Sequence, residues 1–174
     1  VLHSDQVQVS GVAPILLHLA ESGEDLVISG LGYWPAATRP DYFFQDCEGS
    51  IPLGLRRTVV PAAPDAWILA LRRFGTMSFA EVAAAANRYA RDGFTMHTHM
   101  ASFIEAYEEN YRKWDSNRAI YLPRGRPPRE GELFVQRDLA ASLQFMADEE
   151  KAAAGTGREA GLMAARDAFY KGDL

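Results

Sequence analysis

The N-terminal part of the sequence carries two short apolar runs that are separated by a polar turn. The runs cover residues 14–20 and 25–29, and the turn between them, Glu21-Ser22-Gly23-Glu24, contains a glycine. This spacing predicts an antiparallel β-hairpin. Both runs are more apolar than simple alternation requires, which favours strands that are covered on both faces.

The segment 30–58 has no regular hydrophobic period, and we expect an ordered but irregular excursion. It is rich in glycine and proline, and it holds an aromatic cluster made of Tyr33, Trp34, Tyr42, Phe43 and Phe44. Packing of these rings into a core is the more ordinary interpretation. Contact with a ligand is the alternative.

Helical periodicity dominates the rest of the chain. Pro64 suits a first helical turn, and Gly75 stands where that helix should end. A second helix is predicted to begin at the capping box Ser78–Glu81 and to end at Gly93. A third is expected from about Thr98 to Trp114.

The last part of the chain reads as two helices after an irregular connection. The basic, proline-rich stretch from Leu122 to Glu132 is incompatible with regular helix. Helix returns near Asp138, which we interpret as its N-cap. It breaks at residues 152–157, and a final helix runs toward Gly172.

These patterns predict an α+β fold that is mostly helical with an N-terminal β-hairpin. We interpret residues 1–174 as a single incomplete domain, in which 1–58 hold the strands and the irregular segment and 59–174 are mainly helical. The sequence starts at Val1 rather than methionine. We therefore expect both ends to be places where a larger fold has been cut.

Composition and charge restrict the class of protein. The 48% apolar and 11% aromatic residues are enough for a real core. The 18 Lys and Arg against 23 Asp and Glu give a net charge of −5, which argues against nucleic-acid partners. No apolar run is long enough to span a bilayer. No targeting segment is recognisable, so cytoplasmic and periplasmic locations both stay open.

Metal and cofactor signals are weak. His97 and His99 would share a face on a strand, but no third ligand stands at a diagnostic spacing, so we expect surface or capping histidines and no metal. The single Cys47 cannot form an internal disulfide. The stretch Gly155–Gly161 follows a helix and lacks the Lys-Ser/Thr ending of a phosphate loop, so no cofactor is predicted.

The charged clusters have ordinary interpretations as well. Arg56-Arg57 and the arginines of the 122–132 connection could clamp carboxylates, but solvated charge is the simpler interpretation. Glu108-Glu109 and Asp148-Glu149-Glu150 are interpreted as solvated helix faces. Neither a Gly-x-Ser-x-Gly elbow nor a base beside Cys47 is present. We therefore expect no catalytic residue in this chain.

Four stretches, taken in order, resemble the large subunit of the gamma-glutamyltranspeptidase family. They are Val60-Pro61-Ala62-Ala63-Pro64 with the later Phe74-Gly75-Thr76-Met77, then Ala90-Arg91-Asp92-Gly93-Phe94, then Gln136-Arg137-Asp138-Leu139-Ala140 after the basic connection, and finally Phe169-Tyr170-Lys171-Gly172. Each motif alone is weak, whereas the set in this order is specific.

The resemblance implies an N-terminal-nucleophile hydrolase with a four-layer αββα fold, made as a precursor that cuts itself. The family's nucleophile is a Thr that becomes the first residue of the small subunit, where its own α-amine acts as the base. The resemblance therefore implies a heterodimer whose small subunit supplies the catalytic group. The implied substrate is a small-molecule amide, for hydrolysis or acyl transfer.

One departure from the family bears on the substrate. The segment Leu31–Thr38 lies where the family has an arginine that grips the α-carboxylate of a glutamyl group, and Leu31 takes that arginine's place. An aliphatic side chain cannot replace a bidentate guanidinium, so we expect a non-glutamyl amide. Tyr33 and Trp34 flank this position and are candidate substrate-binding residues, together with Arg57. A second departure, an apparent insertion at 151–162, has no assigned function.

Two alternatives stay open at this point. In the first, the protein is a true γ-glutamyl transferase or hydrolase of glutathione metabolism, and Arg39 or Arg57 holds the carboxylate. In the second, it is a non-catalytic scaffold or binding module. A processing Thr in the sequence downstream would favour an enzyme.

Overall fold

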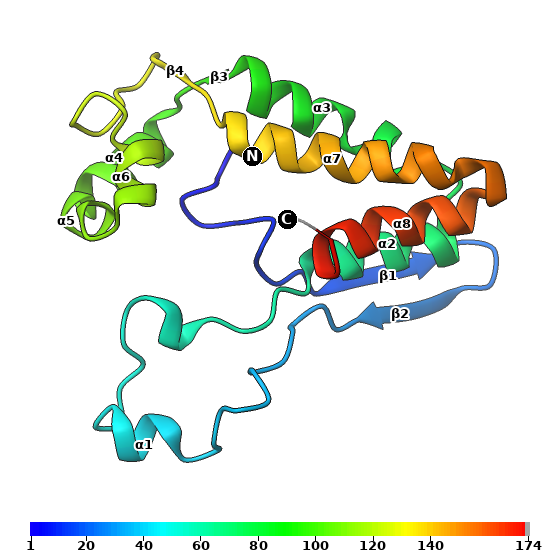
Figure 1. Ribbon diagram of the computed structural model, residues 1–174, viewed down its shortest axis with the longest axis horizontal. Helices are drawn as coiled ribbons and strands as arrows, with labels where there is room; N and C mark the ends of the chain where they lie inside the picture. The colour runs from blue at the N-terminus through cyan, green and yellow to red at the C-terminus, as the bar shows by residue number, and fades with distance from the viewer. Residues whose placement is uncertain (173–174) are drawn as a thin grey trace. The chain divides into compact units, whose positions relative to one another are not determined.

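The computed structural model describes residues 1–172 and shows two compact units (Figure 1). Unit 2 is the continuous segment Val9–Arg73. Unit 1 combines Val1–Gln8 with the described residues from Phe74 onward. No helix within residues 1–172 has the length and apolar character needed to cross a membrane.

Unit 2 begins with the predicted hairpin. Strand β1 (Ile15–Leu19) pairs antiparallel with β2 (Glu24–Ile28), and Leu16 lies opposite Val27 in the register. The prediction that both faces are covered is wrong, because Leu16 is 76% exposed and Val27 is 72% exposed. The side chains alternate between faces, so only the face of Ile15 and Leu17 is partly buried.

The irregular segment of unit 2 contains two short helical turns, α1 (Tyr42–Asp46) and η1 (Leu55–Arg57). Packing of its aromatic cluster into a core is wrong for Tyr33 and Phe44, which are both largely exposed. The segment leads into helix α2 (Ala63–Phe74), whose bounds match the prediction from the sequence. The backbone N–H groups of Ala62 and Ala63 donate to the carbonyl of Gly11, which ties the start of α2 to the chain before β1.

Three long helices form one part of unit 1. They are α3 (Phe79–Asp92), α7 (Arg137–Ala153) and α8 (Arg158–Tyr170), and Figure 1 shows α7 packed along both of the others. The short turn η2 (Ala154–Thr156) joins α7 to α8. The predicted capping box of α3 is confirmed: the Ser78 side chain accepts from the Glu81 N–H, and the Glu81 carboxylate accepts from the Ser78 N–H.

The single helix predicted over 98–114 is wrong. The chain instead forms α4 (Thr98–Ala106), α5 (Glu108–Arg112) and α6 (Asp115–Tyr121). The breaks turn the chain back on itself, so that the ring of Tyr111 lies 4.8 Å from that of Tyr121. A straight helix would carry Tyr111 away from the core against which it packs.

That core lies around a short antiparallel pair, β3 (Phe94–Thr95) and β4 (Leu133–Phe134). Its buried members are Phe94, Met96, Met100, Ile104, Tyr121, Leu122 and Phe134. Helix α7 begins directly after β4, at Arg137, so Asp138 is not its N-cap. The N-cap is Gln136, and its backbone N–H donates to the carbonyl of Ala90 near the end of α3.

Candidate functional site

The backbone around Leu31 is fixed by two glycines in the left-handed region. Gly30 has φ of 52° and Gly32 has φ of 75°. A Cβ on Gly30 would lie 2.1 Å from the Ala13 carbonyl oxygen, and one on Gly32 would lie 2.2 Å from the Val60 carbonyl oxygen. No side chain fits at such distances, so both positions require glycine. Leu31 is therefore held at a defined place between two neighbouring backbone segments.

Hydrogen bonds fasten the same stretch. The Ala13 N–H donates to the Gly30 carbonyl, and the Val60 N–H donates to the Tyr33 carbonyl, each at 2.8 Å. Leu31 is 55% exposed and Tyr33 86%, whereas the ring of Trp34, 42% exposed, lies 5.2 Å from that of Phe43. The stretch thus places three apolar or aromatic side chains, and no charge, on a rigid backbone.

Arg57 and Arg39 both have partners within unit 2. Arg57 donates from Nε to the Pro52 carbonyl and from Nη2 to the Ile51 carbonyl, each at 2.9 Å. Arg39 donates from Nη2 to Asp46 at 2.5 Å, and its Nε lies 3.4 Å from Asp41. None of the described bonds of Arg57 reaches Tyr33 or Trp34. Arg57 therefore holds its own loop, whereas Tyr33 and Trp34 lie near Leu31 only through the sequence.

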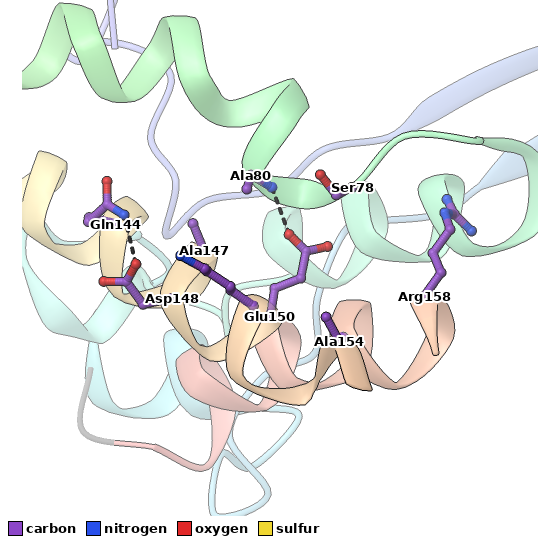
Figure 2. Close-up of a pocket in the computed structure, with 10 residues that line it drawn as sticks. Ser78, Ala80, Gln144, Ala147, Asp148, Glu150, Ala154 and Arg158 are labelled. Atoms are coloured by element: carbon purple, nitrogen blue, oxygen red, sulfur yellow. Dashed lines mark hydrogen bonds between the residues drawn. The ribbon is translucent and has the colours of Figure 1, made fainter. Parts of the chain in front are cut away.

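A cavity of about 570 Å³ lies where α3, α7 and α8 meet (Figure 2). The most buried polar residue that lines it is Glu150, which is only 6% exposed. The Glu150 carboxylate accepts the N–H groups of Phe79 and Ala80, each at 2.8 Å, at the start of α3. The interpretation of Glu150 as part of a solvated face is therefore wrong. Its spacing from Leu143, Met146 and Ala147 on one helical stripe is the signal that could have revealed its burial.

Arg158 and Gln144, two further polar residues around this cavity, also bond within the protein. Arg158 donates to the Met77 carbonyl from Nη2 at 3.0 Å, and Gln144 donates to Asp148 at 2.9 Å. A Cβ on Gly161 would lie 3.1 Å from the Glu150 carbonyl oxygen, so this glycine permits the close packing of α8 on α7. The cavity therefore lies between packed helices, and Gly161 in the 155–161 stretch allows α8 to pack closely on α7.

The arginines of the 122–132 connection hold an internal carboxylate. Glu132 accepts hydrogen bonds from Arg126 at 2.6 Å, from Arg124 at 3.1 Å and from the backbone N–H of Arg129 at 2.9 Å. These donors, Arg126 first, lower the pKa of Glu132 to about 2. This cluster, called the clamp below, thus holds the protein's own Glu132 carboxylate rather than offering its arginines to a ligand.

One histidine behaves as a capping residue, and His18 instead pairs with Asp25 across the hairpin. His97 is the N-cap of α4 and its ring accepts the Met100 N–H. Within residues 1–172, no group of three or more potential ligand side chains is arranged to hold a metal ion. The candidate substrate-binding feature of unit 2 is the rigid stretch around Leu31.

Comparison with known proteins identifies the family. The model of the gamma-glutamyltranspeptidase family matches residues 10–174. The chain is 32% identical over 129 residues to the glutathione hydrolase-like YwrD proenzyme of Bacillus subtilis (strain 168), covering 73% of this chain and 22% of that protein. It is 35% identical over 97 residues to the acylase ACY 1 proenzyme of Pseudomonas sp. (strain SE83), covering 56% of this chain and 17% of that protein.

A solved structure gives the same result for the fold. The crystal structure of Helicobacter pylori gamma-glutamyltranspeptidase superimposes with a TM-score of 0.77 at 22% identity, covering 99% of this chain and 50% of that chain. This likeness shows the fold alone, and it confirms the mostly helical architecture with an N-terminal hairpin. The chain spans 22% and 17% of the length of the two curated relatives. By its sequence and its fold, the chain belongs to the gamma-glutamyltranspeptidase family.

Proposed function

We propose that this chain is part of the large subunit of an amide hydrolase or acylase of the gamma-glutamyltranspeptidase family. Two relatives that are named as a glutathione hydrolase-like proenzyme and an acylase proenzyme support this assignment. The nucleophile is a Thr in the remainder of the protein, released by processing of the precursor. The large subunit then shapes the substrate pocket, while the small subunit carries out the attack.

The exposed face of the hairpin supports a partner from the same precursor. Leu16 and Val27 lie opposite each other on this face and are both largely exposed. Apolar side chains paired across two strands form a surface onto which another layer can pack. We assign this face to contact with the remainder of the protein, as in a processed heterodimer.

The preferred substrate is an amide without a glutamyl head. The observation that carries this proposal is that Leu31, the residue that we match with the family's arginine from the order of the motifs, is held on a rigid backbone. An arginine paired with a carboxylate makes two charge-assisted hydrogen bonds, each contributing about 1.5–3 kcal/mol. Leucine offers neither bond, and a carboxylate brought against it would lose water without gaining a partner.

Tyr33 and Trp34 are the proposed substrate-binding side chains. They follow Leu31 by two and three residues, and aromatic rings contribute large apolar contact area. Tyr33 is largely exposed, and Trp34 is partly exposed beside Phe43. Arg57 is the weaker candidate, because two of its nitrogens already donate to backbone carbonyls. Substrate binding by Arg57 would require those bonds to open.

The second candidate function is γ-glutamyl transfer or hydrolysis. The glutathione hydrolase names of several relatives favour it. It requires another cation to hold the α-carboxylate, and Arg39 and Arg57 are the residues that we considered. Arg39 would have to leave Asp46, which lies 2.5 Å away. This requirement makes γ-glutamyl chemistry the less favoured function.

Substitution at position 31 in the complete, processed protein tests the proposal. We expect Leu31→Arg to raise kcat/KM for a γ-glutamyl anilide by about tenfold or more, since each 1.4 kcal/mol is worth a factor of ten. Leu31→Met is the matched control, because it keeps the size and lacks the charge, and it should leave the ratio of glutamyl to simple acyl activity unchanged. A parent that already prefers the glutamyl compound would overturn the assignment.

A further inference from the structure

Three aromatic rings of unit 2, here called the aromatic ladder, lie against one another. The ring of Trp34 lies 5.2 Å from that of Phe43, and the ring of Phe43 lies 5.2 Å from that of Tyr42. The planes of the first pair meet at 60° and those of the second pair at 67°. Aromatic pairs attract one another at such separations and angles. Contacts within the ladder therefore help to hold the Trp34 ring in place.

Hydrogen bonds fix the backbone on both sides of the contact between Trp34 and Phe43. The carbonyl of Tyr33 accepts the Val60 N–H, and the carbonyl of Phe43 accepts the Gly49 N–H, each at 2.8 Å. A group that binds to rings already held in this way loses little affinity to the ordering of side chains and loops. The aromatic ladder is thus arranged in advance for a further apolar group.

The described residues leave part of the aromatic ladder accessible. Trp34 is 42% exposed, whereas Phe43 and Tyr42 are half-buried. Tryptophan carries a large apolar surface, and a ring brought against it gains both contact area and the attraction between rings. Trp34 is therefore the member of the ladder that offers most ring surface to a ligand.

The position of the aromatic ladder in the chain connects it with the candidate site. Trp34 follows Leu31 by three residues, and three residues of extended chain span at most about 11 Å. Residues 31–38 carry no charged side chain. The next residue, Arg39, is paired with Asp41 and Asp46. These surroundings favour an uncharged, apolar group over a carboxylate.

We propose that Trp34 determines the acyl specificity of the protein, and that the preferred acyl group carries an aromatic ring that packs on the aromatic ladder. This inference rests on the proposed function, because it names the acyl class of the same amide substrate. A saturated ring of similar size gains only buried area on Trp34, whereas an aromatic ring also gains the attraction between rings. That attraction corresponds to a preference by a factor of about two to ten.

Kinetics of the complete, processed protein test the acyl group. Values of kcat/KM are compared for the phenylacetyl, cyclohexylacetyl and acetyl anilides. The parent should prefer phenylacetyl to acetyl by about tenfold or more, because the acetyl group buries no ring. It should prefer phenylacetyl to cyclohexylacetyl by a factor of about two to ten. A parent that uses the acetyl or the cyclohexylacetyl compound as well as the phenylacetyl compound would overturn the inference.

Substitutions assign the preference to a side chain. Trp34→Ala should lower the ratio of phenylacetyl to acetyl kcat/KM by about tenfold, whereas Trp34→Phe keeps a ring and should retain most of the ratio. Phe44→Ala is the matched control, because Phe44 is 76% exposed and should leave the ratio unchanged. Equal changes of the ratio in Trp34→Ala and Phe44→Ala would overturn the inference. An equal loss for all three substrates, with separation of the subunits on size exclusion, would instead assign Trp34 to an interface.

A binding measurement separates failure of this inference from failure of the proposed function. Phenylacetamide is titrated calorimetrically into the complete protein, and Trp34→Ala should weaken its binding by about tenfold. A parent that prefers a γ-glutamyl anilide to the acetyl anilide would overturn the proposed function. Phenylacetamide binding that does not depend on Trp34 would overturn this inference, whatever the result with the glutamyl compound.

Discussion

Glu150 is a single side chain on which two helices depend. Its buried carboxylate accepts the first two N–H groups of α3 from a position on α7. We predict that Glu150→Ala lowers the free energy of unfolding by about 2–4 kcal/mol, because two buried donors lose their acceptor. Glu150→Gln keeps one acceptor and should cost less.

Urea denaturation of the protein measures this effect. The neighbouring Glu149→Ala is the matched control, because Glu149 is exposed and should change the stability by no more than about 0.5 kcal/mol. Equal effects of the two alanine substitutions would show that Glu150 does not bridge α3 and α7.

Glu132 gives the basic connection its response to pH. Three donors hold its carboxylate and lower its pKa to about 2, from an ordinary value of 4.5. Because this pKa is lowered in the folded state, the ionised Glu132 carboxylate stabilises the connection fully above pH 4.5. That stabilisation is lost as the pH falls toward 2. We predict that Glu132→Gln speeds exchange of the Arg129 amide and abolishes its change over this pH range.

Amide exchange followed by NMR would check this behaviour. Glu130→Gln is the control, since Glu130 is exposed on the same connection. A connection that keeps its acid response without the Glu132 carboxylate would contradict the assigned role of the clamp.

At the level of elements, the link between the hairpin and α2 depends on two glycines. We predict that Gly32→Ala destabilises the protein by about 2 kcal/mol or more and lowers kcat/KM, because a Cβ at positive φ would also meet the Val60 carbonyl oxygen. Gly23→Ala at the hairpin turn has a similar φ of 71° and open space around it. It should cost only the backbone penalty of about 1 kcal/mol and leave kcat/KM unchanged.

Thermal unfolding and steady-state kinetics of both variants, made in the complete, processed protein, separate two effects. One is the backbone strain of alanine at positive φ, and the other is the displacement of the backbone around Leu31. If Gly32→Ala behaves like Gly23→Ala in both measurements, the backbone around Leu31 is less rigid than the structure indicates.

Elements with strong local signals could be predicted from the sequence. The bounds of α2 and the capping box of α3 follow from Pro64, Ser78, Glu81 and Gly93, because these residues act within one helical turn. The hairpin likewise follows from its two runs and its glycine turn.

Features set by distant contacts could not be predicted in this way. The helix predicted over 98–114 is broken in the structure, and the breaks bring the Tyr111 ring to 4.8 Å from that of Tyr121, a contact that no local pattern in the sequence marks. Asp138 is not a cap because Gln136 already bonds to Ala90 on another helix. In the candidate site, the order of the motifs is enough to select Leu31 as a candidate position. The close approach of Ala13 and Val60 to the glycines beside it is visible only in the structure.

At the scale of the whole molecule, the chain is expected to depend on the rest of its protein. It spans 22% and 17% of the two curated relatives, and the exposed Leu16 and Val27 offer an apolar face. We predict that residues 1–174 alone show no turnover of amide substrates above background and associate in solution. Light scattering and an amidase assay check this, and co-expression with the remaining protein should restore a soluble, active species.

A well-behaved monomer without accessible apolar surface would contradict the assigned interface. Clear hydrolysis by the isolated chain would contradict the placement of the nucleophile in the remainder.

Substrate choice is the central claim, and one ratio measures it most directly. The complete, processed protein is assayed for kcat/KM with a γ-glutamyl anilide and with a simple acyl anilide that lacks the α-amino acid head. The apolar Leu31 predicts that the simple acyl compound is preferred, because the glutamyl carboxylate would lose about 3–6 kcal/mol of charge-assisted bonding. A preference for the γ-glutamyl anilide by about tenfold or more, equal to 1.4 kcal/mol, would show that another residue holds the carboxylate and would contradict the assignment.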